Sequence, residues 1–246
     1  MKVMNMKKTM IAMLGVAAAA WAQGATELDL SGTWRLSTPS ATNVWDCAVP
    51  GDNASALLKA GFLRDPFWKG QEDCVQWLGN ADWTFARTFD AEALVKRDLD
   101  RHYLEFDSID TVADVVLNGV TLGSVANEFR AWRFDVTKVL RAKGNVLEVR
   151  VKAPRKEAEA RWLRTPDYDI RSWAVTACRE INCLRKCQCS FGWDWGCSLP
   201  VSGIYGGVRI VSCLQRLEQP WAESRLLDDG SAEITVQTGV SPVSSL

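Results

Sequence analysis

Residues 112–122 limit the possible fold more strongly than any other part of the sequence. An apolar run, Val112 to Leu117, is followed by Asn118-Gly119 and then by a second short run, Val120 to Leu122. Asparagine and glycine both tolerate a positive φ, so an Asn-Gly pair between two such runs favours a type I′ turn in a β-hairpin. The sequence therefore predicts antiparallel strands in the middle of the chain.

Further short segments alternate apolar and polar side chains, which is the pattern of a strand with one buried face. They are residues 31–36, 83–89, 103–106, 146–151 and 204–211. Residues 54–60 and 155–163 read as helical, the second supported by Glu157 and Arg161 four positions apart. Many short strands with few helices predict an all-β fold, an antiparallel jelly-roll β-sandwich, over residues 27–213.

The composition of the chain changes after residue 213. Residues 214–224 read as a linker around Pro220, and residues 231–237 alternate as a new strand. A lone strand cannot bury its own apolar face. Residues 214–246 are therefore expected to begin a second domain that this sequence does not complete.

The amino-terminus has the features of a secretory signal peptide. Three lysines in the first eight residues precede an apolar run that is too short to span a bilayer, and residues 20–22 (AWA) fit a cleavage site. We expect residues 1–22 to be removed and the mature protein to be exported, periplasmic or secreted, without a membrane anchor. The net charge of −1 gives no electrostatic footprint for nucleic acid or an anionic membrane, so neither is expected as a partner.

Export changes how the eight cysteines are interpreted. In an oxidising compartment, an even set of cysteines forms disulfides more often than a metal site. Five of them gather in one segment: Cys178, Cys183, Cys187, Cys189 and Cys197. Their spacings do not supply the two CxxC-like pairs of a zinc site, so disulfides are favoured over buried free thiols and over a metal. The pairing cannot be deduced from the sequence.

Several other polar and aromatic residues are interpreted as structural. The single histidine, His102, argues against a Ser-His-Asp hydrolase and is expected on the surface before a strand. Asp107 and Asp110 are a close acidic pair, and we expect turn hydrogen bonds from them rather than catalysis. Four tryptophans are expected mainly in the core: Trp45, Trp68, Trp77 and Trp83.

The strongest candidate for a binding site is Trp193-Asp194-Trp195, which has glycines on both sides. Sugar rings stack their apolar C–H faces on aromatic rings, and one carboxylate can accept hydrogen bonds from two hydroxyl groups. Clustered aromatics with one acid on a loop are therefore suited to a pyranose. The alternative is that both tryptophans pack inward and Asp194 only caps a turn.

Several segments taken together match a pattern seen in one family of enzymes. They begin with Val49-Pro50-Gly51, Asp65-Pro66-Phe67 and Val75-Gln76-Trp77, and continue through Asp82-Trp83-Thr84, Leu117-Asn118-Gly119 and residues 129–137 (FRAWRFDVT). The most specific match is Arg185-Lys186-x-Gln188 leading into residues 191–196 (FGWDWG). Over about residues 28–211 the chain resembles the β-mannosidases of glycoside hydrolase family two.

The resemblance implies an exo-acting, retaining hydrolase of terminal β-linked mannose that needs no cofactor. Such enzymes open with a galactose-binding-like jelly roll, followed by immunoglobulin-like sandwiches and a (β/α)₈ barrel with two catalytic glutamates. The opening domain contacts the terminal mannose through the acid of its WDW loop, here Asp194, with Trp193 and Trp195 shaping that loop. Residues 214–246 would be the linker and first strand of a truncated immunoglobulin-like domain.

Two departures from the family pattern affect this interpretation. Cys197 stands where the family usually has proline, which removes a rigid turn. A barrel needs about 250 residues, and the chain ends too soon after Cys213 to hold one. We therefore expect a truncated amino-terminal sugar-recognition part, without catalytic residues and inactive alone. Its partners would be a β-mannoside-type carbohydrate and the missing carboxy-terminal domains. The alternatives are a free-standing carbohydrate-binding module of the same fold and a disulfide-stapled interaction domain.

Overall fold

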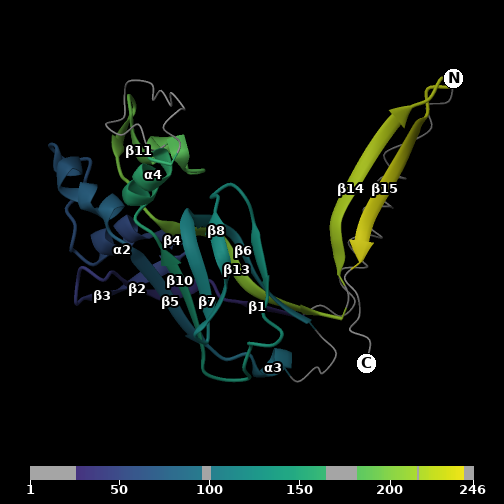
Figure 1. Ribbon diagram of the computed structural model, residues 1–246, viewed down its shortest axis with the longest axis horizontal. Coiled ribbons are helices and arrows are strands. Elements are labelled where there is room, and N and C mark those ends of the chain that lie inside the picture. The colour runs from purple at the N-terminus through teal and green to yellow at the C-terminus, as the bar shows by residue number, and fades with distance from the viewer. Residues whose placement is uncertain (1–25, 96–100, 165–181, 215, 241–246) are drawn as a thin grey trace.

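The computed structural model describes residues 26–95, 101–164, 182–214 and 216–240, and most of them form a sandwich of antiparallel sheets (Figure 1). One sheet has the order β1-β13-β6-β9, and β4 also pairs with β13. Its strands are β1 (Thr26–Asp29), β4 (Gly51–Asp52), β6 (Arg101–Asp110), β9 (Trp132–Asp135) and β13 (Gly203–Cys213).

The second sheet has the order β3-β2-β5-β10-β7-β8. Its strands are β2 (Gly32–Ser37), β3 (Val44–Val49), β5 (Trp83–Phe89), β7 (Val112–Leu117), β8 (Val120–Ala126) and β10 (Asn145–Val151). Strand β10 lies between β5 and β7 although it follows both in the sequence, so the chain crosses between the sheets instead of meandering. The predicted all-β jelly-roll sandwich is confirmed.

The core lies between the two sheets and follows the predicted alternation. In β10, Leu147, Val149 and Val151 are buried, whereas the residues between them face outward. The largest side chains buried in the core include Trp34, Trp83 and Phe106. Removal of this much aromatic and aliphatic surface from water is the main force that holds the sheets together.

The predicted hairpin turn at residues 118–119 is confirmed. Asn118 and Gly119 have φ values of 54° and 82°, the left-handed conformation that a type I′ turn requires. The Asn118 side chain also donates from Nδ2 to the Val139 carbonyl at 2.8 Å and to Asn145 Oδ1 at 3.0 Å. Asparagine therefore both permits the turn and fastens it to the neighbouring loop.

Helices cover the ends of the sandwich. They are α2 (Asn53–Lys59), α3 (Glu92–Val95) and α4 (Pro154–Trp162), with 3-10 segments η1 (Gln71–Asn80) and η3 (Gln188–Ser190). Both predicted helical segments are confirmed. In α4, Arg161 Nε donates to Glu157 Oε1 at 2.8 Å, as their spacing predicted.

Two small ribbons complete the described chain. Strands β11 (Phe191–Trp193) and β12 (Gly196–Ser198) form one, and β14 (Leu217–Leu226) and β15 (Ala232–Val240) form the other. The β14–β15 hairpin stands apart from the sandwich in Figure 1. The linker predicted for residues 214–224 is therefore wrong for most of that range. Pro220 misled the prediction, because the ladder is irregular between residues 218 and 221 and so tolerates a residue without an N–H.

Two of the predictions concern residues that the structure does not describe. The expected signal peptide, residues 1–22, and Cys178 lie outside the described residues. Within the described ranges, none of the helices has the length and apolar character needed to cross a membrane.

The prediction that His102 lies on the surface is wrong. His102 lies in β6 and is 5% exposed, and its Nδ1 is 2.6 Å from Ser212 Oγ on β13.

Candidate functional site

Trp193, Asp194 and Trp195 lie at the tip of the β11–β12 hairpin. Trp193 pairs with Gly196, which leaves Asp194 and Trp195 as a two-residue turn. Trp195 is 73% exposed and Trp193 38%, so neither is packed inward as a core residue. Asp194 is exposed and makes no hydrogen bond or ion pair with another described residue. The alternative of an inward-facing, turn-capping triplet is not what the structure contains.

The base of this hairpin is anchored by its apolar and polar neighbours. Phe191 is 3% exposed and packs in a small cluster with Val112, Ala158 and Leu184. On the opposite strand, Gln76 Nε2 of η1 donates to the Ser198 carbonyl at 2.9 Å. A tip built on a fixed base keeps its side chains in one orientation, which favours recognition over adaptation.

A buried ion pair joins the two ends of the segment that carries the hairpin. The Lys186 ammonium donates to the Asp110 carboxylate, and both side chains are 1% exposed. The same ammonium donates to the Val201 carbonyl at 3.0 Å. Lys186 precedes the hairpin and Val201 follows it, so one charged group fixes both flanks to the end of β6. Asp110 thus makes this pair through Oδ2 in addition to a local bond, in which its Oδ1 accepts from the Thr111 hydroxyl.

The other acid of the pair predicted at this strand has a different role. Asp107 Oδ2 accepts the Gly207 N–H at 2.7 Å, and Oδ1 accepts from Arg209 at 3.0 Å. These bonds cross from β6 to the irregularity in β13 between residues 205 and 208. The hydrogen bond from the Gly207 N–H lowers the pKa of Asp107, and the hydrogen bond and charge of Arg209 lower it further. Asp107 is therefore a cross-strand structural residue and not a turn former.

Glu128 connects the sheet to the approach of the hairpin. Its Oε2 accepts the Cys187 N–H at 2.8 Å, and its carbonyl accepts from Ser108 Oγ at 2.6 Å. Burial raises the pKa of Glu128, and the negative charge of Asp110 raises it further. Together with Lys186, these contacts form a polar base beneath an aromatic tip.

A hollow of about 430 Å³ lies in the segment that leads into η1. Its lining residues are Arg64, Asp65, Trp68, Lys69 and Gln71. Gln71 of this lining is the first residue of η1, and η1 bonds strand β12 of the hairpin further along, where Gln76 Nε2 donates to the Ser198 carbonyl at 2.9 Å.

This hollow was not predicted, because Trp68 was expected in the core. Trp68 is 63% exposed, and its neighbour Phe67 is 73% exposed, whereas Trp45 and Trp83 are buried as predicted. Lys69 Nζ lies 5.2 Å from the centre of the Trp68 ring. The available signal was the composition of residues 64–71 (RDPFWKGQ), where charged residues and glycine surround two aromatics.

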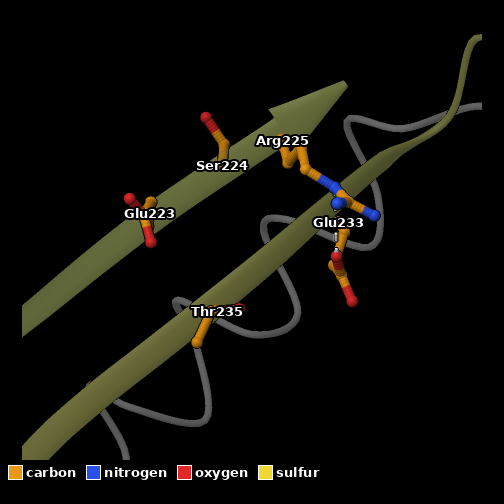
Figure 2. A pocket seen from close by; sticks show the side chains of 5 residues that line it. All are labelled: Glu223, Ser224, Arg225, Glu233 and Thr235. Atoms are coloured by element: carbon orange, nitrogen blue, oxygen red, sulfur yellow. Dashed lines mark ion pairs between the residues drawn. The ribbon is translucent and has the colours of Figure 1, made fainter. Parts of the chain in front are cut away.

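A second hollow, of about 340 Å³, lies on the β14–β15 hairpin (Figure 2). Figure 2 shows it lined by Glu223, Ser224, Arg225, Glu233 and Thr235. Arg225 Nε and Glu233 Oε2 face each other across the two strands at 3.7 Å. None of the described residues that line it is aromatic, so these residues offer no stacking surface for a sugar ring.

The described members of the cysteine cluster are all half-buried and surround the base of the hairpin. They are Cys183, Cys187, Cys189 and Cys197. Cys187 Sγ and Cys189 Sγ are 3.1 Å apart, and their hydrogen bond raises the pKa of Cys189. Within the described part of the chain, no group of three or more His, Cys, Asp or Glu residues is placed to hold a metal ion. The predicted disulfide stays a prediction.

The crossed two-sheet topology defines the class of this protein: it is a galactose-binding-like β-sandwich. Residues 34–206 match the family described as glycosyl hydrolase 2 galactose-binding domain-like. The chain belongs to that family. The matched range contains the tip of the hairpin, its base and the hollow that precedes η1.

Relatives with known names agree with this assignment. A β-mannosidase of Capra hircus is 32% identical over 209 residues, which are 82% of this chain and 23% of that protein. The crystal structure of a β-D-mannosidase from Dictyoglomus thermophilum, 32% identical, superposes with a TM-score of 0.75 over 87% of this chain and 26% of that one. A β-glucuronidase from Ruminococcus gnavus, 15% identical with a TM-score of 0.59, shares the fold. The chain spans about a quarter of the length of the mannosidases it matches.

Proposed function

We propose that this chain is the sugar-recognition part of an exported β-mannosidase-like glycoside hydrolase. In this proposal the complete enzyme removes terminal β-D-mannose residues with retention of configuration. Asp194 accepts hydrogen bonds from hydroxyls of the terminal mannose, and Trp193 and Trp195 border the sugar. The observation that carries the proposal is the exposed carboxylate of Asp194, which makes no bond with another described residue and lies between two outward-facing tryptophans.

The chemistry of that carboxylate supports the role. An exposed acid that makes no bond within the described chain has all its acceptor sites directed to solvent, where sugar hydroxyls can replace water. The tip is held by the Phe191 cluster and by the Lys186 bonds, so little order has to be gained on binding.

The proposal separates recognition from bond cleavage. A retaining glycosidase uses two carboxyl groups about 5 Å apart, one as acid/base and one as nucleophile. We assign these groups to a part of the enzyme outside this chain and assign only substrate contact to the WDW hairpin. Export to the periplasm or the medium, with removal of residues 1–22, belongs to the same proposal and rests on the basic and apolar residues at the amino-terminus.

The test is the substitution Asp194→Asn, measured in the complete enzyme that carries this domain. A hydrogen bond to a charged acceptor contributes about 1.5–3 kcal/mol. The value of kcat/KM for an aryl β-mannoside should therefore fall by about one to two decades. The melting temperature of the isolated domain should stay unchanged, because Asp194 is exposed and bonds to none of the residues that the structure describes.

Asp228→Asn is the matched control. Asp228 is also an exposed aspartate in a hairpin turn, between β14 and β15, but it has no tryptophan beside it. This variant should retain the wild-type kcat/KM. A value within about twofold of wild type for Asp194→Asn, with normal folding, would mean that the sugar is not read through Asp194. Tight binding of mannosides by the isolated chain would instead favour the free-standing module.

A further inference from the structure

Two thiols lie in direct contact where the chain approaches the β11–β12 hairpin. Cys187 Sγ and Cys189 Sγ are 3.1 Å apart, and both residues are half-buried, so small molecules in solution can reach them. A disulfide bond is about 2.05 Å long, so the sulfurs need to approach by only about 1 Å to form one.

The backbone imposes this contact. The Cys187 N–H donates to Glu128 Oε2 at 2.8 Å, and the Ser190 N–H donates to the Cys187 carbonyl at 3.1 Å. The second bond closes the η3 turn, in which Cys189 lies. Glu128 is itself fixed, because its N–H donates to the Arg185 carbonyl at 3.0 Å. The backbone of residues 187–190 is therefore held in a turn, by one bond within the turn and one to the Glu128 carboxylate, and this turn brings the two sulfurs together.

The pair differs from other cysteines of the chain. Cys47 is 1% exposed in the sandwich core, where burial raises its pKa to about 12, so it does not supply a reactive thiolate. Cys74 on η1 is exposed, but it lies on a different element from the pair. Among these thiols, Cys187 and Cys189 combine access with a sulfur neighbour in contact.

We propose that Cys187 and Cys189 form a reversible disulfide by exchange with a low-molecular-weight disulfide such as glutathione disulfide. Either sulfur can donate in the hydrogen bond between them, so either can attack first, and in the sequence that follows it is Cys187. The Cys187 thiolate breaks the external S–S bond, forms a mixed disulfide and releases one thiolate. The Cys189 thiolate then attacks the Cys187 sulfur, forms the internal bond and releases the second thiolate. Two protein thiols are oxidised, one external disulfide is reduced to two thiols, and the two protons pass to the released thiolates.

The bond would lie at a position that concerns the hairpin. It closes a ring around Gln188 and ends at Cys189, two residues before the buried Phe191 from which the hairpin starts. The thiol chemistry does not depend on sugar recognition, so either property can fail without the other.

The experiment equilibrates the protein in glutathione buffers from fully reducing to fully oxidising and then blocks thiols with N-ethylmaleimide. Trypsin cleaves after Lys186 and chymotrypsin after Phe191, which releases residues 187–191 (CQCSF) with both sulfurs and without Cys197. Under reducing conditions this peptide should carry two maleimide groups. Under oxidising conditions it should carry none and should lack two hydrogen atoms, and dithiothreitol should restore the first form.

Two variants sharpen the result. Cys189→Ser removes the resolving thiol, so Cys187 should accumulate as a mixed disulfide with glutathione. Cys74→Ser removes an exposed thiol outside the pair and should leave the internal bond unchanged. Two maleimide groups at every glutathione ratio would overturn the proposal. A bond from either sulfur to Cys178, Cys183 or Cys197 would overturn it as well.

Discussion

Replacement of Lys186 by methionine tests whether the buried ion pair holds the base of the hairpin. The substitution keeps the length of the side chain but removes the charge that faces Asp110, with both positions 1% exposed. Loss of one partner of a buried pair leaves an uncompensated charge and destabilises proteins by about 3–5 kcal/mol. The Val201 carbonyl also loses its donor at 3.0 Å. For a chain of this size, we expect the melting temperature to fall by about 6–20 °C.

Urea unfolding of three variants would measure this loss and attribute it to the pair. Arg35→Met is the matched control, because its partner Asp46 is 68% exposed and surface pairs contribute at most about 1 kcal/mol. The double variant Lys186→Met/Asp110→Leu removes both charges and should be more stable than Lys186→Met alone. If Lys186→Met lowers the free energy of unfolding by less than about 1 kcal/mol, as the control does, the buried pair does not stabilise the base of the hairpin as we infer.

Two further substitutions test other contacts. Burial raises the pKa of Glu128, so the folded state binds more protons than the unfolded state above the ordinary pKa of a glutamate, and wild-type stability falls as the pH rises through that window. Glu128→Gln keeps an acceptor for the Cys187 N–H and removes this titration. The melting temperature of the variant minus that of wild type should therefore rise between about pH 4 and pH 7. A difference that does not change with pH would contradict the raised pKa of Glu128. Gly206→Ala would place a Cβ 2.6 Å from Asp107 Cβ at a φ of +77°, whereas Gly119→Ala, at a φ of +82°, meets nothing within 4 Å. Gly119→Ala should lose only about 1–2 kcal/mol of unfolding free energy for the left-handed conformation. Gly206→Ala should lose more, because its Cβ also clashes with Asp107. Equal losses in urea titrations would show that β13 shifts near Gly206 and relieves this clash.

The strands, the hairpin turn and helix α4 could be predicted because each depends on residues that are close together in the sequence. Residues 83–89 and 112–117 were placed to the residue, since alternation marks a half-buried strand wherever its partner lies. The turn at Asn118-Gly119 and helix α4 depend on φ preference and on side chains four positions apart, which are also legible in the sequence. Strand β14 was missed because proline usually interrupts a ladder, and only the pairing partner reveals that this ladder is irregular there.

The site was predictable in composition but not in arrangement. The triplet at residues 193–195 was identified from residue type and from a resemblance, and the structure places it at an exposed tip. The exposure of Trp68 and the burial of His102 depend on which distant segments cover them, and no local pattern carries that information. The pairing of Lys186 with Asp110 joins residues 76 positions apart in the chain. Contacts at that separation follow from the topology of the sheets.

The β14–β15 hairpin divides the described molecule into two parts of unequal persistence. Its backbone ladder has water on both faces, and none of the residues from 232 to 240 is buried. A two-stranded ribbon of this kind is marginally stable in water, so it should open and close many times while the sandwich stays folded. Amide hydrogens of β14 and β15 should exchange with solvent near the rates of an unfolded chain, whereas those of β10 should exchange only through global unfolding. A single melting temperature therefore reports the stability of the sandwich and does not report that of the β14–β15 hairpin.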